Sequence, residues 1–275
     1  MNLIYFRRLT FRYKLNNCDI NKIIKSINKI SNDNKYIIYT EKYNHYKEKI
    51  LSNKIYFYIK KNKYLKINFS HLYYDAYSIF YILNKIDLIY NNKLYSYKFN
   101  FYNNKFSYLN FISNNYELLK KINTLNIIPF FTNKNKKTFK INKNELKNLS
   151  NSEIIKKILE LHQINKFCLI VNARKTHTEL DNLLGNLIFI TKNLDVKNDL
   201  YNKDNLRKKI NYYSKKKITE LMNLVPNSLI VNSYIGFENP SFVKKFYMNI
   251  TSFGNLLFIY PFNNDEQFII YDYYM

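Results

Sequence analysis

The spacing of apolar side chains alternates between two periods along this chain, and this alternation limits the fold more than any other feature. Short apolar runs typical of strands occupy residues 1–12, 35–40, 55–59 and 64–69. Helical spacing follows an Asn or Asp cap at 19–30 and returns from Ala76, just after the fourth run. Alternating strands and helices predict an α/β protein with mixed sheets and flanking helices.

The same alternation returns in the second part of the chain, after a long polar connection. Residues 91–137 are rich in Asn, Lys and Tyr and contain Pro129, with one short helix expected at 116–122. Beyond them we expect strands at 138–141, 167–172, 187–191, 228–233, 255–260 and 267–271, and helices at 152–162 and 204–224. We therefore divide the chain into an N-terminal half (1–110), a connecting segment (111–137) and a C-terminal half (138–275).

The strong positive charge has two interpretations. The 44 basic and 20 acidic residues give a net charge of +24, which on a globular protein suggests nucleic acid or an anionic surface. However, the chain holds 45 Asn and 39 Lys against two Ala, three Gly and five Arg, as an AT-rich genome would produce. Because the lysines are scattered and form no stripe, we interpret the charge as codon bias and keep nucleic-acid binding as an alternative.

Several classes of protein are excluded or disfavoured by absent patterns. The two cysteines, Cys18 and Cys168, are too few for a disulfide scaffold or a four-thiolate zinc site. The sequence contains no membrane-length apolar run, no signal peptide, and no HExxH, GxGxxG or Walker motif. We expect a cytoplasmic protein without a metal site.

Codon bias also directs attention to the positions that resist it. Both alanines, two of the three glycines and one arginine fall in three segments, 71–80, 172–186 and 231–236. Under pressure to lose these residue types, a position keeps one where the structure or the function needs it. We therefore search these segments for a site.

Two of the four histidines have an aspartate four residues later. His71 and Asp75 lie between a strand and a helix, where side chains are held rigidly, whereas His177 and Asp181 lie in a polar loop. We select His71 and expect His45 and His162 to be solvated. The plain alternative for His71 is a core histidine beside an aspartate that caps the helix.

The segment His71-Leu-Tyr-Tyr-Asp75-Ala76 resembles the HxxxD(G/A) signature of the chloramphenicol-acetyltransferase-like superfamily, which includes condensation domains and BAHD acyltransferases. Asn172-Ala-Arg174 with Gly185-Asn186 is similar to the second-half segment of these proteins. Residues 229–236, which contain Asn232, Tyr234 and Gly236, resemble a strand of condensation domains. The resemblance covers roughly 50–275.

The resemblance implies two acetyltransferase-like halves with an active site at their interface. His71 would be the general base, and Asp75 would form an ion pair with Arg174 that shapes the loop. Gly185, Asn186, Asn232 and Tyr234 would line a substrate tunnel or bind the oxyanion. The implied co-substrate is an acyl thioester of coenzyme A or of carrier-protein phosphopantetheine, with no tightly bound cofactor. The implied partners are an acyl or peptidyl carrier protein and a small-molecule amine or hydroxyl acceptor, as in natural product biosynthesis.

The sequence departs from the signature in ways that keep other interpretations open. Ser70 stands where condensation domains have a first histidine, Ala76 replaces glycine, and a DFGWG segment is missing. The chain is also shorter than a full condensation domain. A degenerate domain that only docks carrier proteins is therefore the main alternative. Arg174 as a surface charge and Gly185 and Gly236 as turn glycines are the plain alternatives for those residues.

Overall fold

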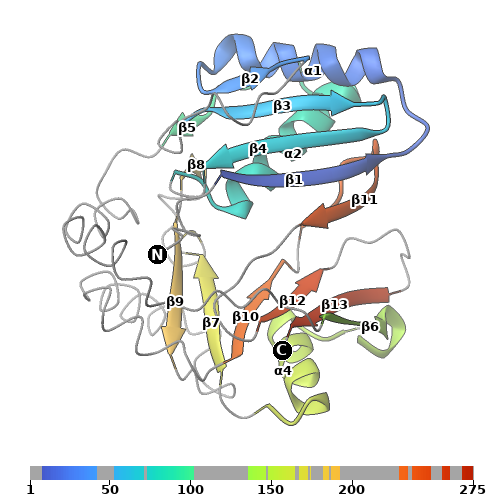
Figure 1. The fold of residues 1–275 in the computed structure, drawn as a ribbon, viewed down its shortest axis with the longest axis vertical. Helices are drawn as coiled ribbons and strands as arrows, with labels where there is room; N and C mark the ends of the chain where they lie inside the picture. The colour runs from blue at the N-terminus through green and yellow to red at the C-terminus, as the bar shows by residue number, and fades with distance from the viewer. Residues whose placement is uncertain are drawn as a thin grey trace, which may run out of the picture.

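The described residues of the computed structural model form two large β-sheets with helices packed against them, and one short two-stranded sheet (Figure 1). The structure describes residues 8–41, 53–70, 73–101, 136–146, 148–164, 167–172, 174, 182–185, 187–192, 229–234, 237–248, 256–260 and 268–274.

The first sheet has five strands in the order β11-β1-β4-β3-β2. Its strands are β1 (Arg8–Leu15), β2 (Ile37–Tyr39), β3 (Ile55–Lys60), β4 (Tyr64–Ser70) and β11 (Val243–Met248). β3 and β4 form the antiparallel hairpin predicted from the sequence, and β1 pairs antiparallel with both β4 and β11.

Two helices among the described residues, α1 (Ile20–Asp33) and α2 (Ala76–Tyr90), pack on one face of the first sheet. α1 begins at Asp19, whose carboxylate accepts the Lys22 N–H, and it buries Ile23, Ile27 and Ile30. Side chains along β1 point alternately to the two faces of the sheet, and every second one packs into this core, where Phe11 is 1% exposed. The opposite face of the sheet therefore carries the remaining, more polar positions.

The second sheet has six strands in the order β6-β13-β12-β10-β7-β9. Its strands are β6 (Lys136–Asn142), β7 (Phe167–Asn172), β9 (Ile188–Lys192), β10 (Leu229–Ser233), β12 (Leu256–Tyr260) and β13 (Phe268–Tyr274). β10 runs parallel to β7 and β12, and the other pairs are antiparallel, so the sheet is mixed. A 3-10 turn, η2 (Lys143–Leu146), and α4 (Asn151–Leu161) follow β6. α4 begins with a capping box between Ser150 and Glu153 and packs Ile158 into the second core.

Two pairings connect the N-terminal and C-terminal parts of the chain. β11 leaves the second part and joins the edge of the first sheet beside β1, in the register Arg12↔Tyr247. The Asn16 side chain donates to Ser241 O at 2.6 Å, 225 residues away, and fixes the start of this crossing. A short parallel pair, β5 (Asn100–Phe101) with β8 (Leu183–Leu184), makes the second connection.

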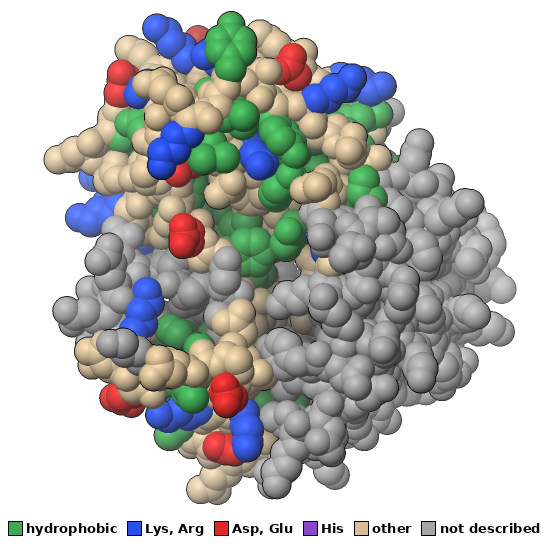
Figure 2. All heavy atoms as spheres, turned by 180° about the vertical axis from the view of Figure 1, so that it is seen from behind, with side chains coloured by type: hydrophobic (Ala, Val, Ile, Leu, Met, Phe, Trp, Pro, Cys, Tyr) green, Lys and Arg blue, Asp and Glu red, His purple; other side chains and the backbone are tan. Residues whose placement is uncertain are grey.

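The described elements agree closely with the segments expected from periodicity, apart from β5, β8 and β11, which the sequence did not predict. The expected helices at 116–122 and 204–224 lie outside the described residues. Within the described part of the chain, no helix is long and apolar enough to cross a membrane. Figure 2 shows basic side chains spread over the helix-bearing side with acidic ones between them, so on this side the described lysines form no stripe.

Candidate active site

The segment that joins β4 to α2 is fixed at both of its ends. Ser70 ends β4, and its carbonyl oxygen accepts the N–H groups of Tyr73 and Tyr74, both at 3.1 Å. Asp75 caps α2 by accepting the Ser78 N–H at 2.9 Å, and its own N–H donates to Gly185 O at 3.3 Å. His71 and Leu72, between these two ends, lie outside the described residues.

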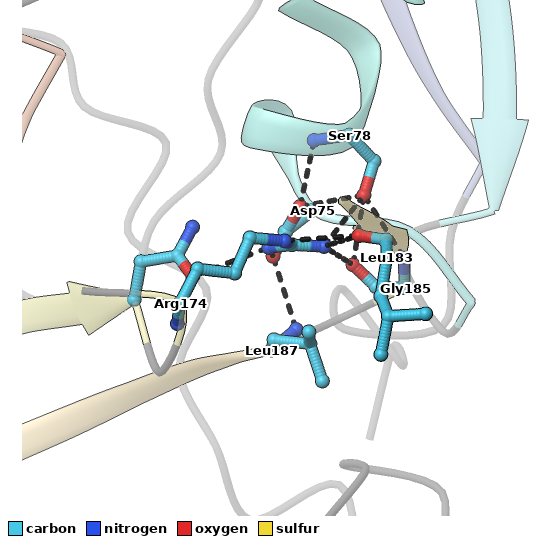
Figure 3. A network of polar contacts seen from close by, with 7 residues as sticks. Asp75, Ser78, Arg174, Leu183, Gly185 and Leu187 are labelled. Atoms are coloured by element: carbon cyan, nitrogen blue, oxygen red, sulfur yellow. Dashed lines mark hydrogen bonds and ion pairs between the residues drawn. The ribbon is translucent and has the colours of Figure 1, made fainter. Parts of the chain in front are cut away.

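The Asp75 carboxylate is fully buried and hydrogen-bonded on both oxygens (Figure 3). Oδ1 accepts from the N–H and from the hydroxyl of Ser78, each at 2.9 Å. Oδ2 accepts from Arg174 Nη1 at 2.7 Å and from the Leu187 N–H at 3.0 Å. A carboxylate has about four acceptor positions, so this one has little capacity left to accept a further proton donor.

Arg174 lies opposite Asp75 and forms with it the ion pair that the resemblance implies. Its side chain is 2% exposed. Nε and Nη2 donate to Leu183 O at 3.0 and 2.7 Å, Nη2 donates to Gly185 O at 3.1 Å, and Nη1 also reaches Asn172 Oδ1 at 3.2 Å. The Tyr77 ring lies 4.6 Å from the guanidinium carbon. Because every charge here has a partner, the cost of burying the pair is offset locally.

Ser78 connects the two charged residues to Gly185, and the sequence analysis did not identify it as part of the site. Its hydroxyl oxygen accepts from Arg174 Nη2 at 3.1 Å and from the Gly185 N–H at 3.0 Å. Gly185 is buried, with its N–H on Ser78 and its carbonyl facing Arg174. Its N–H is therefore already used and cannot bind a substrate oxyanion. The sequence pattern that could have identified Ser78 is its position three residues after an aspartate that caps a helix.

Asn232 and Tyr234 lie together at the end of β10. The Asn232 amide donates to the Tyr234 hydroxyl at 3.0 Å, and the ring of Tyr234 packs edge-on against Phe80 of α2. Burial raises the pKa of Tyr234 above its ordinary value, the hydrogen bond with Asn232 opposes this rise, and the negative charge of Asp75 adds to it. Tyr234 is thus a neutral phenol.

The structure places only some of the expected site residues. It brings Asp75, Arg174 and Gly185 together, and it puts Asn232 beside Tyr234. Asn186 and Gly236 lie outside the described residues, as do His45 and His177. No group of three His, Cys, Asp or Glu side chains suited to a metal ion occurs among the described residues.

One histidine is not solvated as expected. His162, at the end of α4, is half-buried, and its Nε2 lies 3.2 Å from the Tyr271 hydroxyl. The Phe139 ring meets its imidazole edge-on. The expectation was wrong because β6 and β13 bring aromatic rings to the helix end, and Tyr271 on β13 is 109 residues away in the sequence.

The described residues form mixed sheets with flanking helices, which is the α/β fold class that the sequence predicts. No protein-family model and no curated protein sequence matches the chain.

Solved structures match it over almost its whole length at low identity. Vinorine synthase gives a TM-score of 0.53 at 12% identity, covering 98% of this chain and 86% of that one. F. graminearum TRI101, complexed with ethyl coenzyme A, gives 0.51 at 10% identity, covering 98% and 91%. Polyketide synthase associated protein 5 from Mycobacterium tuberculosis gives 0.51 at 11% identity, covering 97% and 89%. At these identities the likeness establishes the fold.

Proposed function

We propose that this protein is an acyltransferase that moves an acyl group from a thioester to an amine or hydroxyl acceptor. The observation that carries the proposal is the buried Asp75–Arg174 pair at the junction of β4 and α2. The pair joins the N-terminal and C-terminal parts of the chain at the segment that contains the HxxxD-like sequence. The fold, which is that of acyltransferases, supports the same conclusion.

In this proposal His71 is the general base. Imidazole titrates near neutral pH, so it can take the proton of the acceptor N–H or O–H as that atom attacks the thioester carbonyl. The C–N or C–O bond forms, the C–S bond breaks, and the thiol leaves with a proton. Asp75 has both oxygens engaged by Ser78, Arg174 and Leu187, so we assign it a positioning role and not that of a proton relay.

The remaining assignments follow from the same proposal. Asn186, Asn232 and Tyr234 would contact substrate or polarise the thioester carbonyl, as preorganised donors do in acyl transfer. The donor would be acyl-coenzyme A or a carrier-protein acyl thioester, with no tightly bound cofactor, and the reaction would take place in the cytoplasm. The N-terminal and C-terminal halves would meet at this site.

The test is acceptor-dependent release of thiol. The purified protein is offered a panel of acyl-coenzyme A and acyl-carrier-protein donors with mixed amine and alcohol acceptors. Free thiol and acylated product are both measured, so that Cys18 and Cys168 do not obscure the result. We expect turnover in the wild type and its loss in His71→Ala, because general-base catalysis contributes about 100- to 10,000-fold.

The matched control is His177→Ala, which removes the histidine of the second His-Asp spacing. It should keep wild-type turnover. Full turnover in a folded His71→Ala variant would refute the role of His71. Absence of turnover in every protein, with carrier-protein binding retained, would replace the proposal by the docking-only alternative.

A further inference from the structure

One face of the first sheet carries neither of the described helices α1 and α2, and on it basic side chains gather without an acidic partner among the described residues. α1 and α2 cover the other face, and α2 lies behind β3 and β4 in the view of Figure 1. On the helix-free face, strands β11, β1 and β4 present a compact group that we call the tyrosine–lysine patch: Arg12, Lys14, Tyr64, Lys66, Lys245 and Tyr247. These three strands contain no Asp or Glu at any position.

The strand register places like charges next to one another in this patch. Arg12 pairs directly with Lys66 across β1 and β4, and Lys14 pairs with Lys245 across β1 and β11. Like charges directly opposite each other destabilise a sheet. Partial burial lowers the pKa of Lys66, and the neighbouring Lys60 and Arg12 lower it further. Among the described residues no carboxylate forms an ion pair with these cations.

Arg12 is the centre of the patch and is held by aromatic rings. Its guanidinium carbon lies 4.5 Å from the Tyr64 ring centroid and 4.7 Å from that of Tyr247. Nε of Arg12 is buried and makes no hydrogen bond within the described structure. A guanidinium stacked on rings in this way keeps its outer N–H groups for a planar anion, which it can bind in a bidentate manner.

The occupied ring faces indicate which anion fits. Arg12 lies over both tyrosines, and Lys245 also lies over the Tyr247 ring at 5.3 Å. Binding of single-stranded nucleic acid uses aromatic faces on which bases stack, and here cations take those faces. The patch is also compact, because three strands span only about 10 Å. It does not form the extended track that a nucleic-acid backbone follows.

We infer that the tyrosine–lysine patch is a docking surface for a protein segment that carries clustered Asp or Glu side chains. A flat sheet face suits a macromolecule better than a small ligand, which needs a concave site. Arg and Tyr at the centre are the residue types enriched at the energetic centres of protein interfaces, and the lysines around them supply charge complementarity. This surface lies apart from the Asp75–Arg174 pair, so the inference does not depend on the proposed acyl transfer.

The test measures binding of a fluorescent oligoglutamate peptide to the full chain by anisotropy, at low and high salt. Lys66→Gln with Lys245→Gln should weaken binding about three- to thirtyfold, the loss expected for two partly exposed ion pairs. The matched control, Lys25→Gln with Lys29→Gln on α1, removes the same charge from the helix side and should leave the affinity unchanged. Arg12→Lys keeps the charge but loses the planar fork, and it should also weaken binding.

Three outcomes would overturn the inference. The first is no salt-sensitive binding of oligoglutamate to the wild type. The second is an equal loss in the two double variants, which would mean that only net charge matters. The third is tighter binding of an oligothymidylate of equal charge, lost in the Lys66/Lys245 variant, which would make the patch a nucleic-acid surface. Neither Lys66 nor Lys245 belongs to the buried core, and circular dichroism checks the fold of every variant.

Discussion

Replacing Arg174 by methionine tests whether the buried ion pair holds the two parts of the chain together. The substitution removes the charge and the donors but keeps most of the volume. Asp75 would retain its bonds from the Ser78 N–H and hydroxyl and from the Leu187 N–H, whereas Leu183 O would lose both of its Arg174 donors. Breaking a buried pair from one side costs about 3 to 5 kcal/mol.

We expect the lower end of this range, about 3 kcal/mol, because the carboxylate keeps three of its four hydrogen bonds. In a chain of this size that loss lowers the melting temperature by about 6 to 12 °C. The assay is urea unfolding followed by far-UV circular dichroism and tyrosine fluorescence, since the chain contains no tryptophan.

The matched control is Lys156→Met, which breaks the pair of Lys156 with Glu160, 3.6 Å apart and 41% and 64% exposed. It should cost no more than about 0.5 kcal/mol, as exposed helix pairs do. Adding Asp75→Asn to Arg174→Met should cost less than the sum of the two single changes, because the unpaired buried charge is then gone. Equal losses in Arg174→Met and Lys156→Met would refute the reasoning.

Two further predictions concern Ser78 and His162. Ser78→Ala should lower the free energy of unfolding by about 1 to 3 kcal/mol, because the Gly185 N–H and an Arg174 N–H lose their buried acceptor; urea unfolding measures this, and an unchanged midpoint would contradict it. Burial lowers the pKa of His162, and Lys137 lowers it further, so the unfolded chain takes up this proton first as the pH falls. The stability contribution is therefore present above about pH 6.5 and lost as the pH falls through the folded pKa. His162→Gln should lose less stability than the wild type between neutral pH and pH 5, and parallel pH curves would count against this.

Local patterns predicted most of the elements because local physics decides them. The change from strand to helical spacing at Ala76 correctly predicted the start of α2, since the aspartate before it caps the helix in the ordinary way. The hairpin turn after β3 was equally visible from its polar residues.

Non-local contacts decided the features that the sequence did not predict. β11 contains Lys244 and Lys245, so its apolar and polar side chains alternate only weakly. It becomes a strand by pairing with β1, which is far away in the sequence. His162 was expected to be solvated because the residues around it in the sequence do not indicate its contacts with Tyr271 and Phe139.

The Asp75–Arg174 ion pair was predicted for a different reason. Arg174 was noticed because arginine is scarce in this chain. Serine is a common residue, and Ser78 matters only because its position brings it to Asp75, Arg174 and Gly185. The backbone groups that complete the network, such as the Leu187 N–H, have no sequence signal at all.

The placement of β11 also governs how the chain acquires its structure during synthesis. β1 leaves the ribosome well before the partner for its outer edge, which arrives only with the segment after Ser241, 225 residues beyond Asn16. At about 5 to 20 residues per second, that interval lasts roughly 10 to 45 s. Throughout it, the edge of β1 is an unpaired strand template of the kind that promotes aggregation. The basic side chains of Arg12 and Lys14, both on this strand, repel a second copy of the same edge and so protect the nascent chain until β11 is made.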